Sequence, residues 1–102
     1  MKTFADIKFK KHRVIEGAIQ GLLTLDNGIE LSVVAGPSLY SLPGGSGPNE
    51  IKLKGPDDVN KFEVAVIDKG GDFIGDDVQG WQTRTQIDKI MTNTPNGFIL
   101  VN

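Results

Sequence analysis

Five potentially cationic side chains fall within six consecutive residues near the start of the chain, in the run KFKKHR. Charge at this density can neutralise the phosphates of a nucleic acid, and the phenylalanine within the run could stack on an unpaired base. A charge run is equally typical of a solvated strand edge, in which case the phenylalanine belongs to the core. The candidate nucleic-acid contacts of this segment are Lys8, Phe9, Lys10, Lys11, His12 and Arg13.

A second candidate is Tyr40, which lies within the Gly- and Pro-rich stretch GPSLYSLPGGSGP of residues 36–48. An aromatic ring held out on a turn can stack on a base for about 1–3 kcal/mol. The alternative is that Tyr40 covers the end of a barrel and keeps its hydroxyl group in water. For Trp81 we expect a structural role, in which it anchors the helix that follows it to the sheet.

The patterns of common enzymes are missing from the sequence. The chain has one histidine, His12, and no orienting carboxylate lies at a recognisable spacing from it, so we expect it to be a polar surface residue. The segment from Gly75 to Gly80 has the first half of a phosphate-binding loop, but Trp81 occupies the position of the required lysine. We therefore expect no enzymatic activity.

Metal and thiol chemistry are not indicated either. The chain contains no cysteine, which excludes disulfides and thiolate metal sites. Asp72, Asp76 and Asp77 lack the alternating ligands and the glycine of a calcium loop, so we interpret them as turn and cap residues. No metal and no cofactor are expected.

Length and composition indicate one domain that spans residues 1–102. No apolar run approaches the roughly 20 residues of a membrane span, and the N-terminus lacks the apolar region of a signal peptide. The net charge of −2 is unevenly distributed, because residues 57–77 are strongly acidic whereas residues 8–13 are basic. Such a split suits head-to-tail association of identical copies.

The elements that must position these residues are mostly strands. Residues 17–25 and 29–35 alternate between apolar and polar positions around Asn27-Gly28, which predicts a β-hairpin with a two-residue turn. Within it, one predicted face carries Ile19, Gly21, Leu23 and Leu25, and the partner strand presents Ile29, Leu31 and Val33 together. Residues 62–67 predict a central strand that is buried on both faces.

The remaining elements are shorter. Residues 4–10 predict an extended segment, with a short helix as the alternative, and residues 51–54 predict an edge strand. A tight turn is expected at residues 68–71, with a brief returning strand at 73–74. Thr83 and Gln86 have the spacing of a capping box, which begins a helix that ends near Asn93. A last strand is expected at 98–101.

Three segments, LDNGIELSVVAGPSLYSLP, KFEVAVID and DVQGWQTRTQID, resemble a family of small proteins from marine cyanophages and ocean metagenomes with an Sm/LSm-like fold. The resemblance covers about residues 17–91. It implies a small, strongly bent five-stranded barrel, here with a short helix near the C-terminus, that assembles into a closed ring, pentamer to heptamer. It also implies binding of RNA or single-stranded DNA in the cytoplasm of an infected host cell.

Within this resemblance, Leu23-x-Leu25-x-Asn27-Gly28 is similar to the first hairpin of the Sm motif, and Ile67-x-Lys69-Gly70 is similar to the element near the RNA-binding pore, which adds Lys69 to the candidate contacts. No run after Gly36 matches the segment whose asparagine reads uracil. The alternative function is a protein-interaction or structural module of a phage that does not bind nucleic acid.

Overall fold

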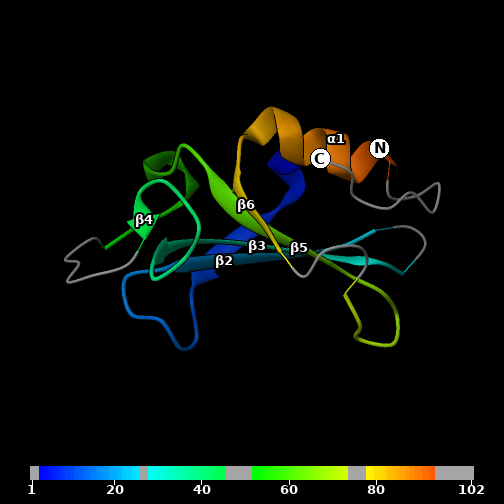
Figure 1. Ribbon diagram of the computed structural model, residues 1–102, viewed down its shortest axis with the longest axis horizontal. Coiled ribbons are helices and arrows are strands. Elements are labelled where there is room, and N and C mark those ends of the chain that lie inside the picture. Colours follow the sequence, from blue (N-terminus) through cyan, green and yellow to red (C-terminus); the bar gives the residue numbers. More distant parts are fainter. Residues whose placement is uncertain (1–2, 26–27, 46–51, 74–77, 94–102) are drawn as a thin grey trace.

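The computed structural model describes residues 3–25, 28–45, 52–73 and 78–93. Five strands form an antiparallel sheet in the order β1-β2-β3-β5-β6, and the short β4 pairs in parallel with the end of β3 (Figure 1). One α-helix and two short 3-10 helices complete the described elements. In chain order these are η1 (Phe4–Asp6), β1 (Lys8–Lys11), β2 (Ile19–Thr24), β3 (Glu30–Pro37), β4 (Gly44–Gly45), η2 (Pro56–Asp58), β5 (Phe62–Ile67), β6 (Gln79–Gln82) and α1 (Arg84–Asn93).

The predicted hairpin is confirmed as β2 and β3, whose register pairs Ile19 with Ala35 and Thr24 with Glu30. Its connection is longer than the predicted two-residue turn, because the N–H of Leu25 donates to the carbonyl of Ile29 at 2.7 Å and three residues lie between them. Gly28 has φ +85°, the left-handed conformation that closes three-residue hairpin loops. Asn27 lies outside the described residues.

The core lies on one face of the sheet, which we call the inner face. Alternate residues of β2, β3 and β5 point into it, as the sequence pattern predicts. Their buried side chains include Ile19, Leu31, Val33, Phe62 and Val64, each with at most 1% of its surface exposed. The opposite face, which we call the outer face, carries the residues that alternate with these. Two of them, Val34 and Ala65, are also buried, and Ala65 accounts for the predicted burial of β5 on its second face.

Helix α1 covers the inner face together with η1, as Figure 1 shows. Its start is the predicted capping box: the N–H of Thr83 donates to Oε1 of Gln86 at 2.8 Å, and the N–H of Gln86 donates to Oγ1 of Thr83 at 3.2 Å. Ile87, Ile90 and Met91 are buried on the face that the helical spacing predicts. The helix reaches Asn93, the last described residue, so its predicted end there stays a prediction.

Arg84 ties this helix to η2 and to the aromatic part of the core. Its guanidinium donates to the carbonyls of Val59 at 3.0 Å and Pro56 at 2.6 Å. The same group lies over the rings of Phe4 and Phe62, at 5.1 and 5.3 Å from their centroids. A planar cation with several donors can make both kinds of contact at once.

Several short elements differ from the sequence predictions. Residues 4–10 hold both the short helix η1 and the strand β1, rather than one of the two. Residues 52–54 are not a strand; Leu53 is buried and its N–H donates to the carbonyl of Gly17 at 2.9 Å. Strand β6 was not predicted, because QGWQ contains a glycine and no apolar alternation. The predicted strand at 98–101 lies outside the described residues.

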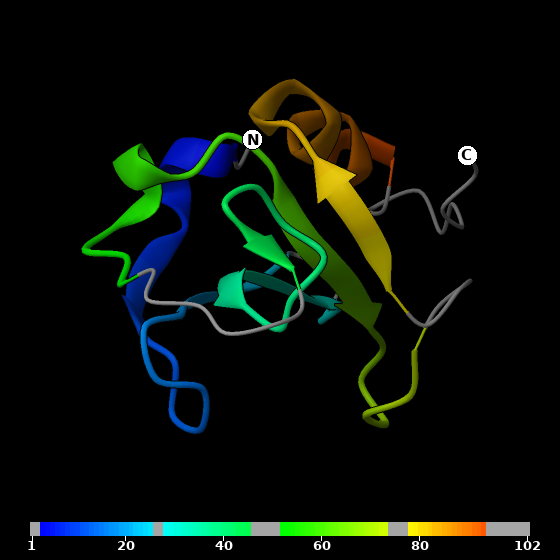
Figure 2. The same cartoon turned by 60° about the vertical axis from the view of Figure 1, so that its left-hand side comes forward.

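The turn at residues 68–71 is confirmed, since the N–H of Gly71 donates to the carbonyl of Asp68 at 3.0 Å and Phe73 pairs back with Ile67. Figure 2 shows the sheet curving between β1 and β6, the two ends of the strand order. No pairing joins these two strands within the described part of the chain, so the sheet is open and closure into a barrel stays a prediction. Among residues that the structure describes, no helix has the length and apolar character that crossing a membrane requires.

Candidate nucleic-acid interface

Strand β1 divides the basic run between the two faces of the sheet. Lys8 and Lys10 lie opposite Leu22 and Gln20 of β2, so both point from the outer face, and both are exposed. Their ammonium groups can therefore reach a ligand laid across that face.

Phe9 lies between these lysines and points the other way, into the core. Its ring centroid is 5.7 Å from that of Phe4 and 5.7 Å from that of Phe62. Because the ring packs against these two rings on the inner face, away from Lys8 and Lys10, we withdraw Phe9 from the candidate contacts. The alternative that placed Phe9 in the core agrees with the structure.

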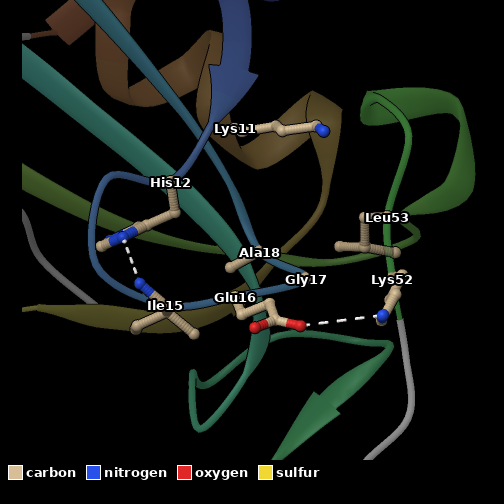
Figure 3. Close-up of a pocket in the computed structure, with 8 residues that line it drawn as sticks. All are labelled: Lys11, His12, Ile15, Glu16, Gly17, Ala18, Lys52 and Leu53. Atoms are coloured by element: carbon tan, nitrogen blue, oxygen red, sulfur yellow. Dashed lines mark hydrogen bonds and ion pairs between the residues drawn. The ribbon is translucent and has the colours of Figure 1, made fainter.

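Lys11 lines a cavity of about 400 Å³ at the end of β1, whose lining is drawn in Figure 3. Lys11 lies at one rim and Lys52 at another, where its Nζ is 3.7 Å from a carboxylate oxygen of Glu16. Both side chains of this ion pair are mostly exposed, so it contributes little to stability. Lys11 lies opposite Ile19 of β2, so along β1 it alternates with Lys8 and Lys10 and does not share their face of the sheet.

His12 stabilises the turn that follows β1. Its Nδ1 accepts hydrogen bonds from the N–H groups of Val14 and Ile15, both at 3.1 Å. This arrangement requires an unprotonated Nδ1, so the proton of the neutral ring is assigned to Nε2. The imidazole is thus a structural acceptor in its turn, whereas Arg13 is exposed beside it.

Tyr40 and Trp81 form an exposed aromatic pair. Their ring centroids are 5.2 Å apart with a tilt of 48°, and the two side chains are 54% and 53% exposed. The N–H of Trp81 donates to the carbonyl of Tyr40 at 2.8 Å, and the N–H of Tyr40 donates to Oε1 of Glu63 at 3.0 Å. Gly80 lies so close beneath Tyr40 that an added Cβ would meet the Cβ of Tyr40 at 2.8 Å. These contacts hold the main chain of both residues in place.

The backbone at Trp81 is strained. Its φ of +52° lies in the left-handed region that non-glycine residues rarely adopt. The strain coincides with a shift of register in the pairing of β5 with β6, between Phe62 and Val64. The predicted role of Trp81 as the anchor of α1 is wrong: the ring is exposed beside Tyr40, and Arg84 and the buried face of α1 hold the helix instead.

The lysines and the aromatic pair lie at opposite edges of the sheet, and one row of residues on the outer face connects them. The register places Lys10, Gln20, Val34 and Glu63 in one row across β1, β2, β3 and β5, all on the outer face. Glu63, the last residue of this row, accepts a hydrogen bond from the main-chain N–H of Tyr40. Because neighbouring strands are about 4.8 Å apart, the row spans about 14 Å across the strands, from β1 to β5. Val34 within this row is only 8% exposed, so a short single strand that contacts both ends must pass over it to reach the more exposed Lys10 and Glu63.

Lys69 lies elsewhere. It belongs to the turn after β5, at the opposite end of that strand from Glu63, and its side chain covers Gly28 of the β2–β3 hairpin. The structure thus places Lys8 and Lys10 at one edge of the sheet, and Tyr40 with Trp81 beside the other end of the row that begins at Lys10. It does not bring Lys69 to either place.

No group of three or more histidine, cysteine or acidic residues that could hold a metal ion occurs among the described residues. Asp76 and Asp77 lie outside them.

The chain matches no family model, and comparisons with curated proteins and with solved structures give no match. The resemblance to the Sm-like cyanophage family therefore stays a prediction.

Proposed function

We propose that this protein binds single-stranded nucleic acid, RNA or DNA, across the outer face of its sheet. Phosphates contact Lys8 and Lys10, and a base stacks on Tyr40 or Trp81. The observation that carries the proposal is the exposed, hydrogen-bonded aromatic pair at the end of a row that begins at a basic strand. Stacking tolerates any base, whereas lysines supply the salt-dependent attraction to the backbone.

Assembly into a closed Sm-like ring is part of the same proposal. Within the described residues, β1 pairs only with β2, and β6 pairs only with β5, so each leaves an edge that another copy can extend. If β1 of one copy pairs with β6 of the next, the lysines of the first copy lie beside the aromatic pair of the second. The ring would then repeat one composite site at every junction. Sedimentation that finds only an 11.0 kDa species at micromolar concentration contradicts the ring.

The binding proposal is tested with fluorescein-labelled 12-nucleotide oligothymidine and oligouridine, measured by fluorescence anisotropy at 50 mM salt. We expect binding that weakens as salt rises, and a loss of about 1–3 kcal/mol for Tyr40→Ala or Trp81→Ala. Trp81 is the only tryptophan, so its intrinsic fluorescence reports directly on stacking. Absence of binding up to high-micromolar protein would refute the proposal.

A protein partner is the second candidate, favoured by exposed apolar side chains away from the aromatic pair, such as Val14 at 84% and Phe73 at 50% exposure. Capture of partners from lysate, with and without nuclease treatment, separates the two. Partners that vanish with nuclease support nucleic-acid binding, and partners that persist support the interaction module.

A further inference from the structure

Glu63 places a negative charge at the aromatic pair. Its side chain is half-buried on the outer face, and Oε1 accepts the main-chain N–H of Tyr40 at 3.0 Å, which holds the carboxylate at the backbone of that residue. A carboxylate offers about four lone-pair positions, so acceptor capacity remains after this one bond. A base stacked on Tyr40 could turn its edge toward this carboxylate, because the carboxylate is bound at the main chain of the same residue.

A carboxylate at this position discriminates between ligands in two ways. It repels phosphate, so the backbone of a bound strand stays toward Lys8 and Lys10 while a base occupies the aromatic end. It also accepts hydrogen bonds and donates none, so it favours base edges that carry N–H donors. Charge and hydrogen bonding thus select the same orientation of the strand.

The four bases differ in this respect. Guanine presents adjacent donors, N1–H and the 2-amino group. Cytosine and adenine each present one amino group beside a ring acceptor. Uracil and thymine present a single N–H flanked by two carbonyl oxygens, which a carboxylate repels.

We infer that Glu63 makes the Tyr40–Trp81 site prefer guanine over uracil and thymine. This inference rests on the proposed function, because it requires that a base stack on the pair. It names a specificity-determining residue that no short motif in the sequence indicates. The preference differs from the uracil reading of the Sm motif, whose asparagine segment this chain lacks.

The test compares labelled 12-nucleotide oligothymidine with the same strand carrying one central guanine, or one central inosine, which keeps N1–H but lacks the 2-amino group. A single guanine avoids self-association of the oligonucleotide. We expect the guanine strand to bind about tenfold more tightly than oligothymidine, within the range for one specific base contact, and the inosine strand to fall between them.

Glu63→Gln keeps an acceptor for the N–H of Tyr40 but offers a donor as well, so the guanine preference should fall below about twofold while oligothymidine binding is retained or strengthened. Glu30→Gln is the matched control, because Glu30 lies on the same face, opposite Thr24 and Ile67, and far along β3 from Tyr40. That variant should keep the full preference.

Equal affinity of the wild-type protein for all three strands overturns the inference and leaves the proposed function standing. A guanine preference that survives in Glu63→Gln also overturns it. If no strand binds at all, the proposed function fails and the inference fails with it. The comparison of strands on the wild-type protein needs no variant, so it does not depend on the folding of Glu63→Gln.

Discussion

Replacing Lys8 and Lys10 with glutamine should weaken binding of single-stranded nucleic acid by a calculable amount. Both ammonium groups leave the outer face from exposed positions on β1, two residues apart. Each phosphate contact on a single strand contributes a slope of about −0.7 to the dependence of log K on log salt. Loss of two contacts should therefore reduce the magnitude of the slope by about 1.4. Extrapolated from 1 M salt, each contact corresponds to about an eightfold change in affinity at 50 mM.

The assay is anisotropy of labelled oligothymidine titrated between 50 and 200 mM salt. The double variant Lys54→Gln/Lys89→Gln is the matched control, because it removes the same charge from exposed lysines outside β1, one of them on α1. We expect the control to bind like the wild-type protein. A slope that is unchanged in the β1 variant, or reduced equally in both variants, would show that these lysines do not contact phosphate.

Three further predictions concern stability and can be measured by urea unfolding. Trp81→Gly should be more stable than Trp81→Ala by about 1 kcal/mol, because glycine adopts positive φ without a Cβ clash, although both variants lose stacking; equal midpoints would contradict the strain at this residue. Phe62→Ala should cost about 3–5 kcal/mol, since the side chain is fully buried and packs against Phe4 and Phe9; a cost below about 1 kcal/mol would contradict the packing. Thr83→Ala should cost about 1 kcal/mol through loss of the cap, whereas exposed Thr85→Ala should not.

The framework of the fold could be predicted because its signals are local. The alternation in residues 17–25 and 29–35 defines β2, β3 and their shared face, and the spacing from Thr83 to Met91 defines α1 and its cap. The predicted loop length is wrong because Asn27-Gly28 suits both two-residue and three-residue hairpin loops. The two loops differ in which backbone groups are hydrogen-bonded, not in their amino-acid composition.

The elements that could not be predicted are held by contacts from distant parts of the chain. The main-chain N–H of Leu53 donates a hydrogen bond to the carbonyl of Gly17, which is distant in sequence. The alternation of lysines around Leu53 therefore could not indicate whether this segment pairs with a strand of the sheet. Strand β6 contains Gly80 where Tyr40 packs closely, and a strand defined by such an approach has no apolar pattern of its own.

The candidate site was recognised only in part for the same reason. Tyr40 and the basic run are visible as residue types, but the partners that define the site, Glu63 and Trp81, come from β5 and β6. In the sequence of β5, Glu63 is the one polar residue of an otherwise apolar strand, and this pattern does not indicate its hydrogen bond to Tyr40. The strain at Trp81 is a backbone property that residue type does not reveal.

That strain also bears on whether the aromatic pair covers the end of the sheet or binds a ligand. A left-handed conformation at a non-glycine residue costs roughly 1–2 kcal/mol. A covering role would offset this cost by burying apolar surface, yet more than half of each ring stays in water, and the pair contributes only about 0.5–1.5 kcal/mol beyond that burial. Glycine at position 81 would remove the strain and leave the buried core of β5 unchanged. Under the proposed function, a stacked base would cover the exposed part of the rings and add about 1–3 kcal/mol that the pair lacks on its own.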